Sequence, residues 1–139
     1  MNNLLQALMT KISGSAFSSD VGGRVYLDAV PADEMPATFP YCAFFIVSGT
    51  PDDVFAKKGR DILIQFSLFS VSAGAAEITT MYNDLHSLLD ECSFTIISNV
   101  LSLMREANLT TMVDDITVND ASQSVKHWAV DFEVVTQES

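Results

Sequence analysis

The chain has 139 residues and a formal net charge of −11, with 7 Lys and Arg against 18 Asp and Glu. A chain of this length has the size of one domain, so we expect residues 1–139 to form a single domain. The charge argues against DNA binding, because nucleic-acid-binding proteins present a basic face to the phosphates. A hydrophobic fraction of 48% is enough for a packed core, and no apolar run reaches the roughly 20 residues of a membrane helix.

The first predicted element is an amphipathic helix. Its Leu and Ile residues between positions 4 and 12 recur at spacings of three and four, and Gly14 can end it. No basic stretch precedes the apolar residues, so we interpret this segment as part of the fold rather than as a signal peptide, and we expect the protein to stay in the cytosol. Residues 15–23 are mostly small and polar and are predicted to form a loop.

Three strands are predicted next. A short strand covers residues 24–28, and a proline-rich, acidic loop at 29–40 leads to an apolar strand at 41–49. This second strand is apolar on both faces, which predicts a central strand that is covered twice. A connection at 50–59 leads to a long strand at 60–71, whose alternation of apolar residues indicates one core face.

The second half contains the clearest helix, predicted over residues 72–92. A short extended piece at 94–97, a strand at 100–106, a polar and acidic linker at 108–123 and a last strand at 125–135 follow. The element order is therefore αβββαββ. It predicts an α+β domain with a mostly antiparallel sheet of about five strands and two helices packed on one face.

The sequence contains no motif with the residue spacing of a known catalytic or metal site. His86 and His127 lie outside any HExxH pattern and away from zinc-ligand spacing to Cys42 or Cys92. The two cysteines are expected to be reduced and structural. The acidic clusters lack the alternating spacing of a calcium loop and are interpreted as solvated loop charge. We therefore expect no catalytic residue, no cofactor and no metal.

Local motifs over nearly the whole chain resemble those of the tail terminator, or tail completion, proteins of long-tailed bacteriophages. A leading helix (LLQALMTKI) precedes GGRVYLD, and a proline-bearing loop runs into FPYCAFFIVSG. A strand with a small-residue helix start (IQFSLFSVSAGAAEI) follows, the helix ends in LHSLLDE, and HWAVDFEV comes near the C-terminus. The family often has Trp before the serine of this strand end, where this chain has Phe69.

The resemblance implies a structural, non-enzymatic protein of the virion tail of a phage or prophage, present in the host cytoplasm during assembly. Such proteins are similar in forming a homo-oligomeric ring, commonly a hexamer, on the tail tube protein. The ring stops tube polymerisation and offers the docking surface for the head connector, which completes head–tail joining. DNA passes the bore without specific binding, and no membrane is involved.

One predicted contact surface is the 50–59 connection together with Arg60. The connection is long for a hairpin and contains both apolar and basic side chains: Val54, Phe55, Lys57 and Lys58. In a ring of like subunits these residues could meet an acidic loop next door, such as the one that contains Asp33 and Glu34. An ordinary solvated hairpin loop is the alternative.

The last strand carries a second prediction. Trp128, Val130, Phe132 and Val134 alternate with polar residues and are expected on the core face. Asp131 and Glu133 then point away from the core and could line the bore, where carboxylates repel DNA phosphates over about 8 Å. The alternative is that this face is outer solvent surface and that the acidity only aids solubility.

Three other functions remain open. Another neck or head–tail connector protein of the phage would have similar size and composition. A small α+β ligand-binding domain or enzyme would need convergent polar groups that no motif indicates. An acidic DNA mimic would need carboxylates spread along one face, whereas here they lie mostly in predicted loops.

Overall fold

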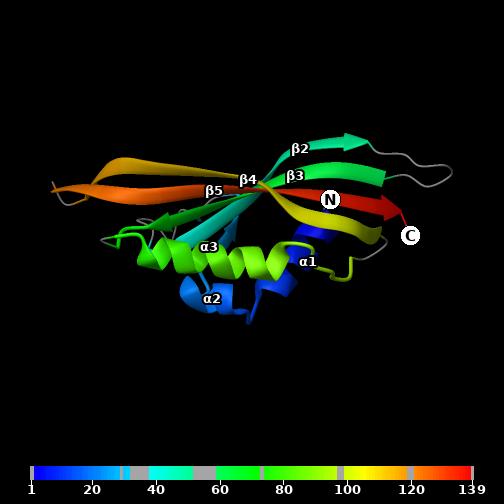
Figure 1. Cartoon of the computed structure of the whole chain (residues 1–139), viewed down its shortest axis with the longest axis horizontal. Helices are drawn as coiled ribbons and strands as arrows, with labels where there is room; N and C mark the ends of the chain where they lie inside the picture. The colour runs from blue at the N-terminus through cyan, green and yellow to red at the C-terminus, as the bar shows by residue number, and fades with distance from the viewer. Residues whose placement is uncertain are drawn as a thin grey trace.

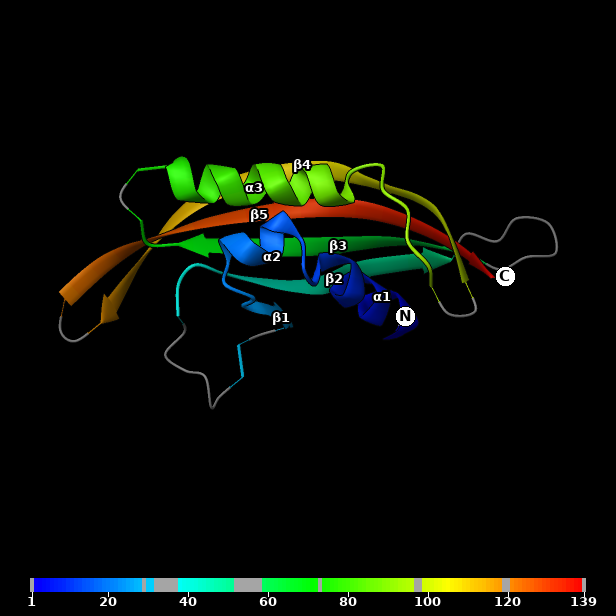
Figure 2. The same cartoon turned by 90° about the horizontal axis from the view of Figure 1, so that it is seen from below.

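The computed structural model describes residues 2–28, 30–31, 38–51, 59–72, 74–96, 99–118 and 121–138. Within these ranges one layer is a five-stranded sheet, and the second layer is formed by helices that all lie on one of its faces (Figures 1 and 2). The helices are α1 (Asn2–Ile12), α2 (Ala16–Asp20) and α3 (Ala76–Leu89), and the strands are β1 (Val25–Leu27), β2 (Tyr41–Pro51), β3 (Gly59–Ser70), β4 (Asn99–Val118) and β5 (Ala121–Glu138). The predicted α+β class is confirmed.

The strand order across the sheet is β1-β2-β3-β5-β4. β1 and β2 are parallel, and the other three neighbouring pairs are antiparallel. The mostly antiparallel sheet is therefore as predicted. β5 follows every other strand in sequence yet lies between β3 and β4, so it supplies hydrogen bonds to both neighbours.

The core lies between the sheet and the helices. Phe44 of β2 stacks on Phe66 of β3 with ring centroids 5.0 Å apart, and Phe66 meets Phe132 of β5 edge-on at 5.6 Å. Burying one such side chain stabilises the fold by roughly 1.5–3 kcal/mol. Side chains from α1, α2 and α3 cover the core on the helix side of the sheet: Leu8, Ile12, Phe17, Ile78, Met81 and Leu85.

Helix α2 lies in the segment for which a loop was predicted, and that prediction was wrong. Its single turn is capped by Ser15, whose hydroxyl oxygen accepts a hydrogen bond from the Ser18 backbone N–H at 3.2 Å. Its one large apolar residue, Phe17, is fully buried. One capped turn with one core residue is too short to show helical periodicity, which explains the error.

The predicted linker at 108–123 was also wrong. β4 continues through residue 118, and β5 begins at residue 121, so the two strands form one long hairpin paired from Asn99↔Glu138 to Val118↔Ala121. Its outer part projects beyond the rest of the sheet (Figure 1). A ribbon that no helix covers has no core face, so it lacks the alternation from which a strand is predicted. The predicted piece at 94–97 contains only an isolated bridge at Ile96 among its described residues, and α3 begins at Ala76 rather than near residue 72.

Candidate assembly surface

The face of the sheet opposite the helices carries a row of aromatic side chains, and we call this side the helix-free face. The strand register places Tyr41 of β2, Phe69 of β3, His127 of β5 and Met112 of β4 next to one another. Tyr41 stacks on Phe69 at 4.6 Å between ring centroids, and Phe69 stacks on His127 at 4.4 Å. The aromatic row therefore crosses three strands, and Met112 continues it onto β4.

Two further tyrosine and phenylalanine rings extend the row at its β1 end. Tyr26 of β1 lies 6.1 Å from Tyr41, and Phe39, just before β2, lies 5.2 Å from it. Burial in this cluster, followed by the nearby Tyr26, raises the pKa of Tyr41. Among the described residues no helix lies on the second apolar face of β2, which is shielded by this ring cluster. In this part of the chain the prediction that β2 is covered on both faces by other elements was therefore wrong.

The two carboxylates predicted to line a bore both lie in β5 at positions that alternate with the core residues. Val130, Phe132 and Val134 are fully buried and Trp128 packs against the core, as predicted for this face. Asp131 and Glu133 are half-buried, and each has a partner on a neighbouring strand.

Those partners change the charge of this surface. Gln65 Nε2 of β3 donates to Asp131 Oδ1 at 2.9 Å, which leaves the charge of Asp131 in place. Arg105 of β4 binds Glu133 through Nε at 3.1 Å and Nη2 at 2.9 Å from Oε1, which neutralises Glu133. Sequence reasoning missed this pair because the contact depends on the register between β4 and β5.

Of the residues predicted for a subunit or tube contact, only Arg60 lies in the described part of the chain. It is exposed at the start of β3, opposite Pro51 of β2 and Thr136 of β5. The remaining residues of that prediction lie outside the described residues: Val54, Phe55, Lys57, Lys58, Asp33 and Glu34.

On the opposite side of the molecule a polar cluster joins α3 to β4. Tyr82 Oη donates to Glu106 Oε2 at 2.7 Å, and His86 Nδ1 lies 2.9 Å from Glu106 Oε1. The Glu106 backbone N–H donates to Asp90 Oδ1 at 2.9 Å. Burial, and then the bond to Glu106, raise the pKa of Tyr82 to about 12. The polar groups of this cluster bind one another. The cluster therefore attaches α3 to β4, and none of its side chains is placed as a free nucleophile.

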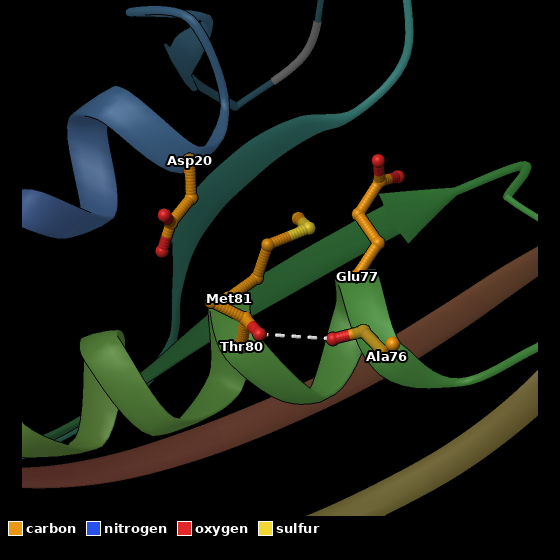
Figure 3. Close-up of a pocket in the computed structure, with 5 residues that line it drawn as sticks. All are labelled: Asp20, Ala76, Glu77, Thr80 and Met81. Carbon is orange, nitrogen blue, oxygen red and sulfur yellow. Dashed lines mark hydrogen bonds between the residues drawn. The ribbon is translucent and has the colours of Figure 1, made fainter.

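A surface hollow between α2 and α3 contains another acidic group (Figure 3). Asp20, the last residue of α2, faces Ala76, Glu77, Thr80 and Met81 of α3 across the hollow. Burial, followed by a hydrogen bond to the Asp84 carboxylate and its charge, raises the pKa of Asp20 to about 6. The Ser70 hydroxyl donates to Glu77 Oε1 at 2.6 Å, so Glu77 is held towards β3.

Both cysteines are free. Cys42 is fully buried in β2, which raises the pKa of its thiol, and the half-buried Cys92 points its sulfur at Met104 Sδ, 3.8 Å away. Within the described ranges no three His, Cys, Asp or Glu side chains are grouped so that they could hold a metal ion. Among the helices of the same ranges, none is both long and apolar enough to cross a membrane.

The fold occurs in a solved virion. The structure superposes with a TM-score of 0.62 on a chain from the "Virion of native gene transfer agent (GTA) particle", at 18% sequence identity and over 96% of each chain. The two chains share a fold. No protein-family model matches the sequence, and no curated protein sequence matches it.

Proposed function

We propose that the chain is a structural protein of a phage-like virion and that, within the virion, it is the tail terminator. In this role it forms a ring on the finished tail tube, stops the addition of tube subunits and presents the surface to which the head connector docks. No step of this function needs catalysis. It needs surfaces that are complementary between neighbouring subunits around a closed ring.

The observation that carries the proposal is the shared fold with a gene transfer agent virion chain over 96% of both chains. The tail terminator role in particular rests on the resemblance of the local motifs, from the leading helix to HWAVDFEV.

The helix-free face is the proposed bore surface. Asp131 keeps its negative charge there, while Glu133 is neutralised by Arg105, so each subunit would contribute one uncompensated carboxylate from this pair. Repetition around a ring gives a wall that repels phosphate within about a Debye length of 8 Å. DNA would then pass without being bound.

The connection between β2 and β3 is the proposed contact with the tube or with a neighbouring subunit. Arg60, exposed beside it, is the described member of its basic group. Changing Lys57 and Lys58 together to Glu should weaken assembly and its salt dependence while the unfolding temperature stays unchanged. A double variant that assembles like the parent protein at every salt concentration would remove this loop from the interface.

The function is tested by deleting the gene from a phage or prophage that carries it and imaging the particles. A tail terminator predicts tail tubes of uncontrolled, excessive length and heads without tails. Restoring the gene in trans should restore one tube length. Tubes of normal length that fail to join heads would instead assign the chain to the neck, the alternative role in the same virion.

A further inference from the structure

The β4–β5 hairpin ends in a two-stranded arm, formed by residues 111–118 of β4 and 121–127 of β5. β3 ends at Ser70, which pairs with Lys126, so β5 has no described neighbour on that side beyond this point. β4 is the last strand of the sheet, so its outer edge has no strand beside it in the described part of the chain. The arm projects past α3 and the other strands (Figures 1 and 2).

The part of β4 that leads into this arm lacks the features that normally protect an edge strand. Residues 107–113 (ANLTTMV) contain no charge and no proline, and the two irregularities of β4 lie at or before the start of this run, at Leu101/Leu103 and Glu106/Asn108. Met112, on the helix-free face, is 37% exposed, and Val113, on the other face, is 67% exposed. An uncharged open edge with exposed apolar side chains is a template for another strand.

The same chain has a second open edge, at the far side of its sheet. β1 pairs with Cys42–Phe44 only, and the last bond of this pairing runs from the Asp28 N–H to the Phe44 carbonyl at 2.9 Å. Among the described residues no strand lies outside β2 from Phe45 to Pro51. Val47, the extra residue where the register shifts, is 48% exposed at this edge.

Strand directions make these two edges complementary. β2 is antiparallel to β3, β3 to β5 and β5 to β4, so β2 and β4 run in opposite directions. A second copy placed head to tail, with its helices on the same side and its strands in the same directions, therefore presents β2 antiparallel to β4 of the first. Such a contact is heterologous and leaves one edge open at each end for the next copy.

Charge favours this pairing over contact between two arms. The chain carries a net charge of −11, so copies repel each other except where the surface lacks carboxylates. The uncharged run of β4 continues in sequence into Asp114 and Asp115, whereas residues 45–51 of β2 carry no charged side chain. An arm against β2 therefore opposes an acidic strand to an uncharged one, whereas an arm against an arm opposes two acidic strands.

We infer that the β4–β5 arm of one copy docks along the open edge of β2 in a second copy of this chain. This contact deepens the proposed ring, since repeated around the ring it joins each subunit to the next. The contact itself requires only self-association, so it can be tested apart from the role in the virion.

The test uses two variants that each destroy one half of the contact. The arm variant carries Met112→Lys and Val113→Lys, and the edge variant carries Val47→Lys. Asn83→Lys, on the exposed side of α3, is the matched control. Oligomer size is measured by native mass spectrometry and by sedimentation over a concentration series, and thermal unfolding confirms that each variant is folded.

The parent protein and the Asn83→Lys control should assemble, and the arm and edge variants should each associate about 100-fold more weakly, because a lysine buried at the contact has no partner. An equal mixture of the two variants should form a heterodimer that grows no further, since the arm of one variant and the β2 edge of the other are intact. Amides of 109–113 should exchange more slowly in the assembled parent than in the monomeric arm variant.

Three results would overturn the contact. The first is a parent protein that stays monomeric at all concentrations. The second is a mixture that forms no heterodimer although the parent assembles, and the third is an edge variant that assembles normally, as it would if two arms met. A parent that forms open chains and a mixture that forms the heterodimer would support the contact and contradict the closed ring of the proposed function.

Discussion

On the helix-covered face of β3, Ile62, Ile64 and Phe66 are fully enclosed, whereas Leu63, Gln65 and Phe69 on its other face keep part of their surface accessible. Residues a few positions apart in one strand therefore have different roles. The covered face holds the sheet to the helices through a closed apolar core. The helix-free face is organised by contacts within the sheet and leaves side chains available to a partner. Substitutions on the covered face should therefore lower the free energy of unfolding more than substitutions on the helix-free face.

The largest difference is expected between two phenylalanines of β3. Phe66→Ala should lower the free energy of unfolding by about 3–5 kcal/mol, since it opens a cavity between Phe44 and Phe132. Phe69→Ala should cost less than half of that, because the ring is partly exposed and stacks on Tyr41 and His127 at the surface of the sheet. Urea unfolding of both variants measures the difference. Equal losses would mean that the helix-free face belongs to the core.

A second comparison contrasts two glutamates of the β4–β5 hairpin. Glu106→Ala should cost about 1–3 kcal/mol, because it leaves the Tyr82 hydroxyl and the His86 ring nitrogen without their acceptor. Glu133→Ala should cost at most about 1 kcal/mol, since its partner Arg105 is 59% exposed and water screens the pair. The order of the two unfolding midpoints checks this. A larger loss for Glu133→Ala would contradict the assignment of structural polar contacts to the helix side.

The third prediction concerns the proposed bore. Replacing Asp131 and Glu133 together by Lys should change the unfolding free energy by only about 1 kcal/mol, through loss of the Gln65 and Arg105 contacts. The same variant should gain affinity for DNA that weakens with added salt. Asp131→Asn with Glu133→Gln is the matched neutral control and should show no such gain. Assembled particles that eject DNA at the unaltered rate would reject the lining role.

The smallest expected effect is a pH dependence at the α2–α3 junction. The pKa of Asp20 is raised from 3.8 to about 6 in the folded state. Between these values the folded protein keeps a proton that the unfolded chain has lost, so stability contributed by this group falls as pH rises towards 6 and is absent above it. Asp20→Asn should therefore match the parent near pH 4 and exceed it above pH 6, by at most about 1 kcal/mol because the carboxyl is partly solvated. Parallel stability curves for both proteins would contradict the shift.

The elements that were predicted correctly are those that pack on the core. The long strand expected at 60–71 lies at Gly59–Ser70, and the clearest helix is α3, because apolar residues recur in both with the period of the structure. The arm and α2 were missed for the opposite reason, since neither presents a repeating apolar face to the core. The aromatic row and the Arg105–Glu133 pair depend on which residues face each other across strands, and register is a property of the folded sheet.

The position of β5 has a consequence for how the chain is made. The strand that lies between β3 and β4, with Val130, Phe132 and Val134 completely enclosed, is the last of the five strands to leave the ribosome. Until residues 121–138 have been synthesised, β3 and β4 have no strand between them, and the apolar faces of β3 and α3 stay open to solvent. A prematurely terminated product therefore cannot form the sheet, and only a chain that includes β5 can enter an assembly as a folded subunit.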